Sequence, residues 1–224
     1  MCGGFGTRLA KVSKGIPKAL LPITHQKVYL DILLEKIFQF SINRVYLSLH
    51  YKSELFDSYI NQSKYKSKLR SVIEKKPLGT GGAVKNVLIN TNISAKFITI
   101  NGDSLSNINL YKMREYFFDG NFKAMVGVSK IKNVERYGRV EIRTPRVHKF
   151  YEKGSTGSGW INNGYYYLTK EIFENMKGEF SLEKSIFPKL ANDGELYCFK
   201  VENDNFIDIG IPEDYKKICN MFKD

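Results

Sequence analysis

The sequence predicts an α/β fold in which helices flank a central sheet. In the first half of the chain, short apolar stretches alternate with stretches of helical periodicity, an order that implies right-handed crossovers and a mostly parallel, Rossmann-like sheet. In the second half, short candidate strands follow one another closely, so a smaller β-rich part is expected there. Two glycine-rich loops, at residues 2–6 and 76–82, interrupt this pattern.

The expected elements follow from these patterns in chain order. The first half should hold helices at residues 28–41, 53–62, 83–90 and 109–118 and strands at residues 44–50, 69–74 and 96–100. The second half should hold strands at residues 123–129, 138–142, 147–152, 160–168, 196–201 and 206–207 and helices at residues 181–191 and 212–221. Because no repeat or linker separates the halves, we predict a single domain over residues 1–224, divided into parts of about 1–120 and about 121–224.

Composition and charge narrow the class of protein. The 224 residues are 42% hydrophobic and 26% charged, which is ordinary for a soluble domain, and we expect neither a membrane span nor a signal peptide. The net charge of +12 comes from dispersed lysines, so we expect a solvated surface rather than a nucleic-acid interface. The three cysteines are scattered, which fits a reducing cytoplasm.

The glycine-rich segment at the start of the chain is a candidate phosphate-binding loop. Gly3, Gly4 and Gly6 leave backbone N–H groups uncovered, and successive N–H groups can surround a phosphate. Arg8 and Lys18 add two cations that suit phosphate oxygens. The loop matches neither the G-x-G-x-x-G fingerprint nor the P-loop. We interpret it as a site for a nucleotide triphosphate, with a flexible glycine-rich terminus as the alternative.

Two acidic residues follow predicted strands. Asp103 comes after the strand at residues 96–100, at the strand end where open α/β sheets bind ligands. Asp208 stands between apolar residues just ahead of the last helix, and a buried acid requires a partner. A shared Mg²⁺ ion would suit both carboxylates. The alternatives are a helix cap at Asp103 and an interaction with a helix N-terminus at Asp208.

The β-rich half offers polar residues for a second substrate. Glu152 and Lys153 end a predicted strand and suit sugar hydroxyls and a phosphate, with an exposed ion pair as the alternative. Asn162 lies within an aromatic strand, where a buried amide must be hydrogen-bonded. Gly138 marks a bulge or a close approach of another chain segment.

The order of these motifs resembles the sugar-1-phosphate nucleotidyltransferase family over nearly the whole chain. The motifs are Gly-Gly-Phe-Gly-Thr-Arg-Leu, Pro-Lys, Pro-Leu-Gly-Thr-Gly-Gly, Asn-Gly-Asp, Tyr-Gly, Glu-Lys, Asn-x-Gly and Asp-Ile-Gly-x-Pro. Within the family, residues 77–83, 101–104, 180–184 and 206–215 look most like the D-glycero-D-manno-heptose 1-phosphate guanylyltransferases. The resemblance implies that an NTP, here GTP, reacts with a sugar 1-phosphate to give an NDP-sugar and pyrophosphate, for capsule or lipopolysaccharide synthesis.

The resemblance also implies roles for the matching positions. Residues of both glycine-rich loops would hold the nucleotide: Gly3, Gly4, Gly6, Thr7, Arg8, Gly79, Thr80 and Gly81, with Asp103. Four charged residues would be catalytic: Arg8, Lys18, Asp103 and Asp208. Asp103 and Asp208 would share Mg²⁺ as the cofactor. Residues of the β-rich half would bind the sugar 1-phosphate: Gly138, Glu152, Lys153 and Asn162.

Alternatives to this assignment remain open at the level of the sequence. The base could be uracil, cytosine or thymine, and the sugar a hexose. A non-catalytic nucleotide-sugar sensor that keeps the fold is a second class of function, and a nucleic-acid-binding protein is a third. We expect the protein to bind its two substrates, the NTP and the sugar 1-phosphate, and to bind neither nucleic acid nor a membrane. A homodimer is compatible with the sequence.

The start of the chain departs from the family pattern. The family opens with an apolar strand of about six residues before the glycine loop, whereas here only Met1 and Cys2 precede Gly3. A parallel sheet without its central strand would expose unpaired backbone. Either the natural start lies upstream or another segment fills the place, and without that strand we expect a poorly held loop and low activity.

Overall fold

The chain forms two compact units in a computed structural model that describes residues 1–4, 6–151, 156–202 and 204–223. The first unit comprises Met1–Pro77, Asn101–Ser104 and Ile207–Asp224, and the second comprises Leu78–Ile100 and Leu105–Phe206. These units do not coincide with the halves expected from the sequence, because most of residues 78–120 group with the β-rich part. The single-domain assignment stays a prediction.

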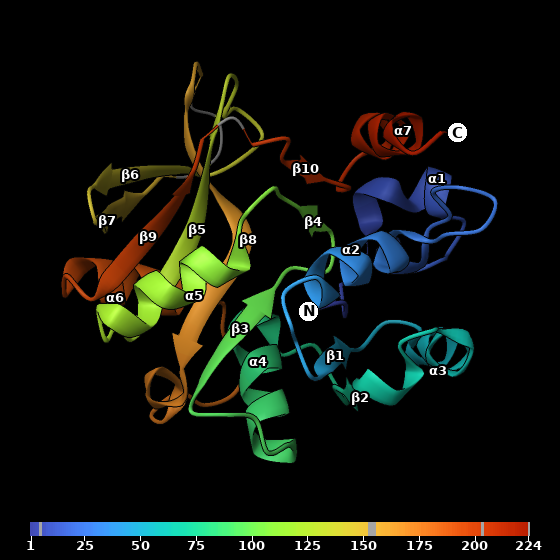
Figure 1. Cartoon of the computed structure of the whole chain (residues 1–224), viewed down its shortest axis with the longest axis horizontal. Helices are drawn as coiled ribbons and strands as arrows, with labels where there is room; N and C mark the ends of the chain where they lie inside the picture. Colours follow the sequence, from blue (N-terminus) through green and yellow to red (C-terminus); the bar gives the residue numbers. More distant parts are fainter. Residues whose placement is uncertain (5, 152–155, 203, 224) are drawn as a thin grey trace. The chain divides into compact units, whose positions relative to one another are not determined.

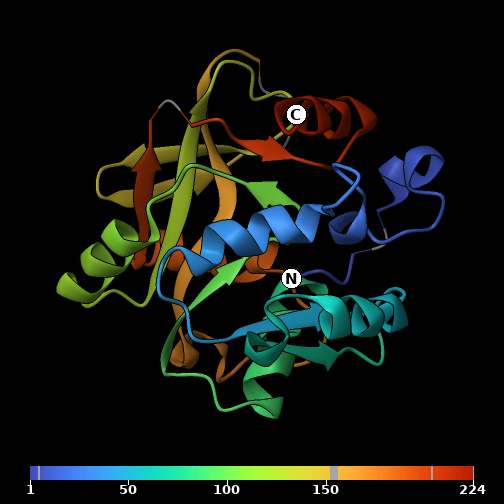
Figure 2. The same ribbon diagram turned by 45° about the vertical axis from the view of Figure 1, so that its right-hand side comes forward.

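The first unit is built on a pair of parallel strands. It contains α1 (Ala10–Ser13), α2 (Tyr29–Phe38), β1 (Val45–Leu49), α3 (Ser53–Gln62), β2 (Leu69–Ile73), β10 (Ile207–Asp208) and α7 (Pro212–Met221). β1 and β2 pair in register from Val45 opposite Leu69, and α3 lies beside them (Figures 1 and 2). Helix α2 buries Leu30, Leu33 and Ile37, apolar residues that recur at helical spacing within the expected range.

Met1 and Cys2 lie beside β1. The Cys2 N–H donates to the Ser48 carbonyl of β1 at 2.9 Å, and the Met1 carbonyl accepts from the Gly102 N–H at 2.9 Å. These two residues therefore hydrogen-bond to β1 on one side and to the segment that carries Asp103 on the other. They form backbone contacts of the kind that the expected strand would form at this point of the first unit.

The second unit contains a six-stranded sheet in the order β3-β8-β5-β9-β7-β6. Its strands are β3 (Lys96–Ile100), β5 (Ala124–Ile131), β6 (Arg139–Arg143), β7 (Arg146–Phe150), β8 (Gly159–Thr169) and β9 (Leu196–Val201). The α/β class is confirmed, but the sheet is mixed rather than mostly parallel. β8 lies antiparallel between β3 and β5, whereas β5 and β9 are parallel. The hairpin β6–β7 adds further antiparallel pairs.

Helices cover both faces of this sheet because neighbouring side chains of a strand point to opposite faces. Helix α5 (Leu110–Asp119) packs Phe117 on Tyr167 of β8, with ring centroids 4.9 Å apart. Helix α6 (Phe187–Asn192) packs Phe187 on the adjacent Tyr166, with centroids 5.0 Å apart. Figure 1 shows the two helices around the sheet.

Helix α2 ends at Phe38 rather than at residue 41, and two other helices begin differently from what the sequence predicted. α4 spans Gly79–Asn90, so the second glycine-rich segment forms the first turn of the helix rather than a loop ahead of it. The helix expected at residues 181–191 opens as a π-helical turn, Leu182–Ile186, before α6. No helix in the described part of the chain is long and apolar enough to cross a bilayer.

A hydrogen-bonded cluster around Asp204 joins the segments that follow β4 (Ser104–Leu105) and β9 in the second unit. The Asp204 carboxylate accepts from the hydroxyls of Ser106 and Ser129 and, at 2.6 Å, from the Asn107 N–H. Asn163 donates to the Ser129 hydroxyl at 3.0 Å. Because Ser129 and Asn163 are fully buried, water cannot replace these bonds.

We expect Asp204→Ala to lower the free energy of unfolding by about 2–4 kcal/mol, since it leaves the buried hydroxyls of Ser106 and Ser129 without their acceptor. Urea denaturation monitored by circular dichroism measures this. Asp193→Ala, at an exposed acid of the same unit, is the matched control and should change stability by less than about 0.5 kcal/mol. Equal stability of the two variants would contradict the structural role of the Asp204 cluster.

Candidate active site

Four charged side chains assigned from the sequence belong to the first unit, although they lie up to two hundred residues apart in the chain. Arg8 lies in the short helix Thr7–Leu9 after the first glycine loop, and Lys18 begins the helix Lys18–Leu20. Asp103 follows β3, and Asp208 ends β10. The Ile209 N–H donates to the Asp103 carbonyl at 3.0 Å, which fixes the two acidic segments side by side.

Lys18 and Asp103 form an ion pair. Lys18 Nζ lies 2.9 Å from Asp103 Oδ2, and 17% and 32% of the two side chains are exposed. The stem of Lys18 runs against Gly6, where an added Cβ would lie 3.1 Å from Lys18 Cγ. Gly6 has φ +63°, in the region that favours glycine, so it serves both the turn and the close approach of Lys18.

Asp208 is largely withdrawn from solvent. Burial, together with the nearby negative charge of Asp103, raises its pKa to about 6, although Lys18 and Arg8 act in the opposite direction. Asp208 Oδ1 is buried and has no hydrogen-bond partner among the described residues. Arg8 and Asp208 both face Gly210, because an added Cβ there would lie 3.1 Å from Arg8 Nη2 and 3.0 Å from Asp208 Oδ1.

These residues fit a divalent cation that also binds phosphate. A buried carboxylate oxygen without a partner, close to a second carboxylate, is the donor set that Mg²⁺ uses when phosphate and water complete its shell. Among the described residues, no group of three or more His, Cys, Asp or Glu side chains is arranged to hold a metal. A cation at this site would therefore take at most two protein carboxylates, Asp103 and Asp208.

The first glycine loop lies at the end of β1. An added Cβ at Gly3 would meet the backbone nitrogen of His50 at 3.1 Å, whereas one at Gly4 would meet nothing within 4 Å. Gly4 therefore presents an open backbone, as a phosphate-binding loop requires. Thr7 begins the short helix, and Phe5 lies outside the described residues.

The second glycine segment packs tightly against Phe180 in the second unit. The carbonyl of Phe180 accepts from the N–H groups of Gly81 at 3.0 Å and Gly82 at 3.1 Å. An added Cβ at Gly79, which has φ +72°, would lie 2.5 Å from this same carbonyl oxygen. These glycines therefore have a packing role that the sequence did not indicate, and their contact with a base stays a prediction.

We expect Gly79→Ala to destabilise the protein by at least about 1 kcal/mol more than Gly178→Ala, because only the former adds a steric clash to the backbone strain. Gly178 is the matched control, since its φ is +70° but nothing lies within 4 Å of an added Cβ. Thermal unfolding of both variants measures the difference. A destabilisation no larger at Gly79 than at Gly178 would contradict the close packing on Phe180.

Gly138 and Asn162, two of the residues assigned to the sugar phosphate, belong to the second unit. Glu152 and Lys153 lie outside the described residues. Gly138 immediately precedes β6, and an added Cβ there would lie 3.0 Å from the carbonyl of Tyr151, which agrees with the close approach expected at this glycine. Asn162 lies on β8, where its amide donates to Tyr166 at 3.0 Å and accepts from the Gly164 N–H at 2.9 Å.

The sequence reasoning missed two acids that the structure places beside predicted site residues. Glu74 follows β2, is only 7% exposed, accepts from Ser48 at 2.9 Å and lies against Gly3. Glu183 accepts from Thr80 at 2.6 Å. Glu74 could have been recognised as an acid at a strand end, just ahead of the second glycine segment. Glu183 lies in a segment that carried the family resemblance, but its partner is remote in sequence.

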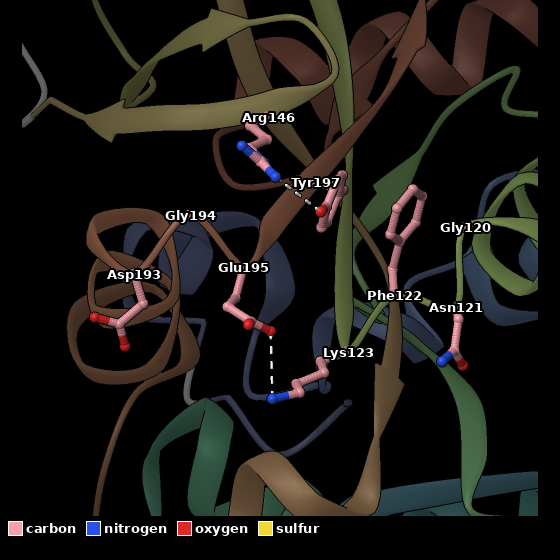
Figure 3. Close-up of a pocket in the computed structure, with 9 residues that line it drawn as sticks. All are labelled: Gly120, Asn121, Phe122, Lys123, Arg146, Asp193, Gly194, Glu195 and Tyr197. Carbon is pink, nitrogen blue, oxygen red and sulfur yellow. Dashed lines mark hydrogen bonds and ion pairs between the residues drawn. The ribbon is translucent and has the colours of Figure 1, made fainter.

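A cavity of about 360 Å³ lies elsewhere in the second unit, at the starts of β5 and β9. Figure 3 shows its lining residues, none of which was assigned to the site: Gly120, Asn121, Phe122, Lys123, Arg146, Asp193, Gly194, Glu195 and Tyr197. Lys123 lies 3.4 Å from Glu195, and Arg146 contacts the hydroxyl of Tyr197 at 3.4 Å. The basic side chains thus already contact groups of the cavity wall.

Comparison with known proteins identifies the class of protein that this fold and site define. The nucleotidyl transferase family matches residues 1–223, and the chain belongs to this family. The chain is 36% identical over 219 residues to the D-glycero-alpha-D-manno-heptose 1-phosphate guanylyltransferase of Aneurinibacillus thermoaerophilus, covering 97% of this chain and 94% of that protein. It is 34% identical to the protein of the same name from Campylobacter jejuni, with 96% and 95% covered.

Solved structures agree with this family. HddC from Yersinia pseudotuberculosis is 39% identical, and its crystal structure gives a TM-score of 0.87 over 99% of this chain and 97% of HddC. A second crystal structure of HddC contains GMP-PN. A glucose-1-phosphate thymidylyltransferase from Bacillus anthracis, described as putative in its crystal structure, shares the fold with a TM-score of 0.84 at 18% identity.

Proposed function

We propose that this protein makes a nucleotide sugar and pyrophosphate from GTP and D-glycero-D-manno-heptose 1-phosphate. The observation that carries the proposal is the grouping of Arg8, Lys18, Asp103 and Asp208 in the first unit of a nucleotidyltransferase fold. Two cations and two acids at a glycine-rich loop suit a triphosphate and its Mg²⁺ ion.

The chemistry needs charge and position rather than a strong base. A phosphate oxygen of the sugar 1-phosphate attacks the α-phosphorus of the nucleotide, and pyrophosphate leaves. Because the attacking phosphate is already ionised, the protein has to align it and neutralise charge. In this proposal Arg8 neutralises the leaving pyrophosphate and Lys18 contacts the reacting phosphates. A bound Mg²⁺ ion would supply further neutralisation of the phosphate charge at Asp103 and Asp208.

The choice of guanine and heptose is supported by two relatives that carry this activity in their names and by the GMP-PN complex of HddC. Residues Gly79, Thr80 and Gly81 are the proposed neighbours of the base, and Gly138, Glu152, Lys153 and Asn162 those of the sugar phosphate.

The remaining parts of the proposal concern the setting of the reaction. The substrates are the expected partners, and a homodimer is a compatible assembly. We place the reaction in the cytoplasm, which is supported by the three free cysteines, because free thiols persist in reducing compartments. The product would serve synthesis of a surface polysaccharide.

A pyrophosphate-release assay with four NTPs against a panel of sugar 1-phosphates tests the proposal. We expect turnover to be highest with GTP and D-glycero-D-manno-heptose 1-phosphate. Higher turnover with another NTP or with a hexose 1-phosphate would show that the proposed substrates are wrong and would identify the right ones. A purified, folded protein that releases no pyrophosphate with any pair would overturn catalysis and favour a nucleotide-sugar sensor.

A further inference from the structure

A network of side-chain hydrogen bonds connects the second glycine segment to the strand that carries Asn162. At its centre is Glu183, in the π-helical turn Leu182–Ile186. Glu183 Oε2 accepts from the hydroxyls of Thr80 at 2.6 Å and Ser181 at 2.7 Å, and Glu183 Oε1 accepts from Tyr166 at 3.2 Å. Tyr166 in turn accepts from the Asn162 amide at 3.0 Å. All these residues lie within the second unit.

The directions of the hydrogen bonds are set by the chemistry of the groups. A carboxylate only accepts, so Thr80, Ser181 and Tyr166 must each donate their hydroxyl proton to Glu183. With its proton used in this way, Tyr166 can only accept from Asn162, which therefore turns its NH₂ group toward the ring hydroxyl. The Asn162 oxygen accepts from the Gly164 N–H at 2.9 Å, so the amide is held from both ends.

The same segment also holds the glycine turn through the backbone. The Thr80 hydroxyl accepts from the Leu182 N–H at 2.9 Å, and the Phe180 carbonyl accepts from the N–H groups of Gly81 and Gly82. Residues 180–183 thus form both main-chain and side-chain hydrogen bonds with the first turn of α4. Glu183 also contacts β8, because it accepts from Tyr166.

We propose that Glu183 is a positioning residue that aligns the base-binding turn at Thr80 with the sugar-binding amide of Asn162. The inference rests on the proposed function, because that function assigns the two ends of the network to different substrates. Glu183 touches neither substrate in this proposal and acts through Thr80 on one side and through Tyr166 on the other. Its loss should therefore weaken binding of both substrates, while the chemical step changes less.

Glu183 has two branches of hydrogen bonds, the first to Thr80 and the second through Tyr166 to Asn162. Three substitutions separate the effects of these two branches. Glu183→Ala removes both, so we expect KM to rise about tenfold for the nucleotide and for the sugar 1-phosphate, with kcat changed less than about threefold. Glu183→Gln keeps an oxygen that can accept from Thr80. Its NH₂ group then faces Tyr166, where the carboxylate presented an accepting oxygen. Tyr166→Phe removes the second branch alone. Both of these variants should raise KM for the sugar 1-phosphate about tenfold and leave KM for the nucleotide within about twofold.

The experiment is steady-state pyrophosphate release with each substrate varied in turn, with thermal unfolding of every variant. Glu179→Ala, at an exposed acid of the preceding loop, is the matched control and should leave both KM values unchanged. If Glu183→Ala does not fold, Glu183→Gln and Tyr166→Phe still test the sugar branch.

The outcomes distinguish this inference from the proposed function. An active wild type in which Glu183→Gln and Tyr166→Phe leave KM for the sugar 1-phosphate unchanged overturns the positioning role alone. A rise in KM for the nucleotide only, in Glu183→Ala, also overturns it, because Glu183 would then serve its own segment. A folded wild type without turnover for any substrate pair overturns the proposed function and this inference with it.

Discussion

Asp103→Ala is expected to lower kcat at least about a hundredfold while the protein stays folded. The Asp103 carboxylate lies 2.9 Å from Lys18 Nζ and contributes to the raised pKa of Asp208, so it acts on both neighbours. Its removal takes away one of two carboxylates that suit Mg²⁺ and releases Lys18 from its ion pair. Pyrophosphate release at saturating Mg²⁺ measures the loss, and circular dichroism checks the fold.

Asp57→Ala provides the comparison for this variant. Asp57 is an exposed acid on α3 of the same unit, so its removal changes the net charge equally without touching the cluster. We expect kcat within about twofold of the wild type, as for other surface substitutions away from a site. Near-normal, Mg²⁺-dependent turnover of Asp103→Ala would refute its place in the site.

Local patterns predicted most elements because those elements depend on neighbours in sequence. The spacing of Leu30, Leu33 and Ile37 marked α2, and all three are buried. The strand expected at residues 96–100 is β3 with the same bounds. The antiparallel insertion of β8 between β3 and β5 was not predictable in this way, because strand partners far apart in sequence leave no local signal.

For the candidate site, too, the sequence indicated the kinds of residue involved but not which residues contact one another. The residue types at Arg8, Lys18, Asp103 and Asp208 suggested phosphate and metal chemistry, and the family resemblance supplied the roles. Spacing alone gives no reason for residue 18 to pair with residue 103. The partners of Glu183 and Asp204 were invisible for the same reason, since serine, threonine and tyrosine hydroxyls are common and only the fold selects among them.

Asp208→Asn is expected to have two opposite effects, a loss of activity and a gain of stability in the absence of metal. Activity should fall at least about a hundredfold, because a neutral amide binds Mg²⁺ more weakly than a carboxylate and would hold the ion poorly beside the reacting phosphates. Stability should rise by about 1–2 kcal/mol at neutral pH, because a neutral amide costs less to bury than a carboxylate whose Oδ1 lacks a partner.

The pH dependence gives this prediction its sign. In the folded protein the pKa of Asp208 is raised from 3.8 to about 6, so without metal the wild type loses stability as pH rises through this interval. The loss is complete above pH 6 and should be absent in Asp208→Asn. Urea denaturation in EDTA at pH 4.5 and pH 7.5 measures it, and a wild type that loses no more stability than Asp208→Asn would contradict the prediction.

Added Mg²⁺ should then make the wild type more stable than Asp208→Asn, the reverse of the order without metal. An ion that binds only the folded wild type raises its unfolding temperature as the ion concentration rises above the Kd, whereas Asp208→Asn has lost one of the two carboxylates and should respond weakly. Asp214→Asn is the control, because Asp214 lies near Asp208 but is not a proposed ligand. If Mg²⁺ stabilised Asp208→Asn as much as the wild type, the buried acid would have a purely structural role. The combination of lost activity, higher metal-free stability and a weaker metal response is specific to a carboxylate that is kept buried for a cation.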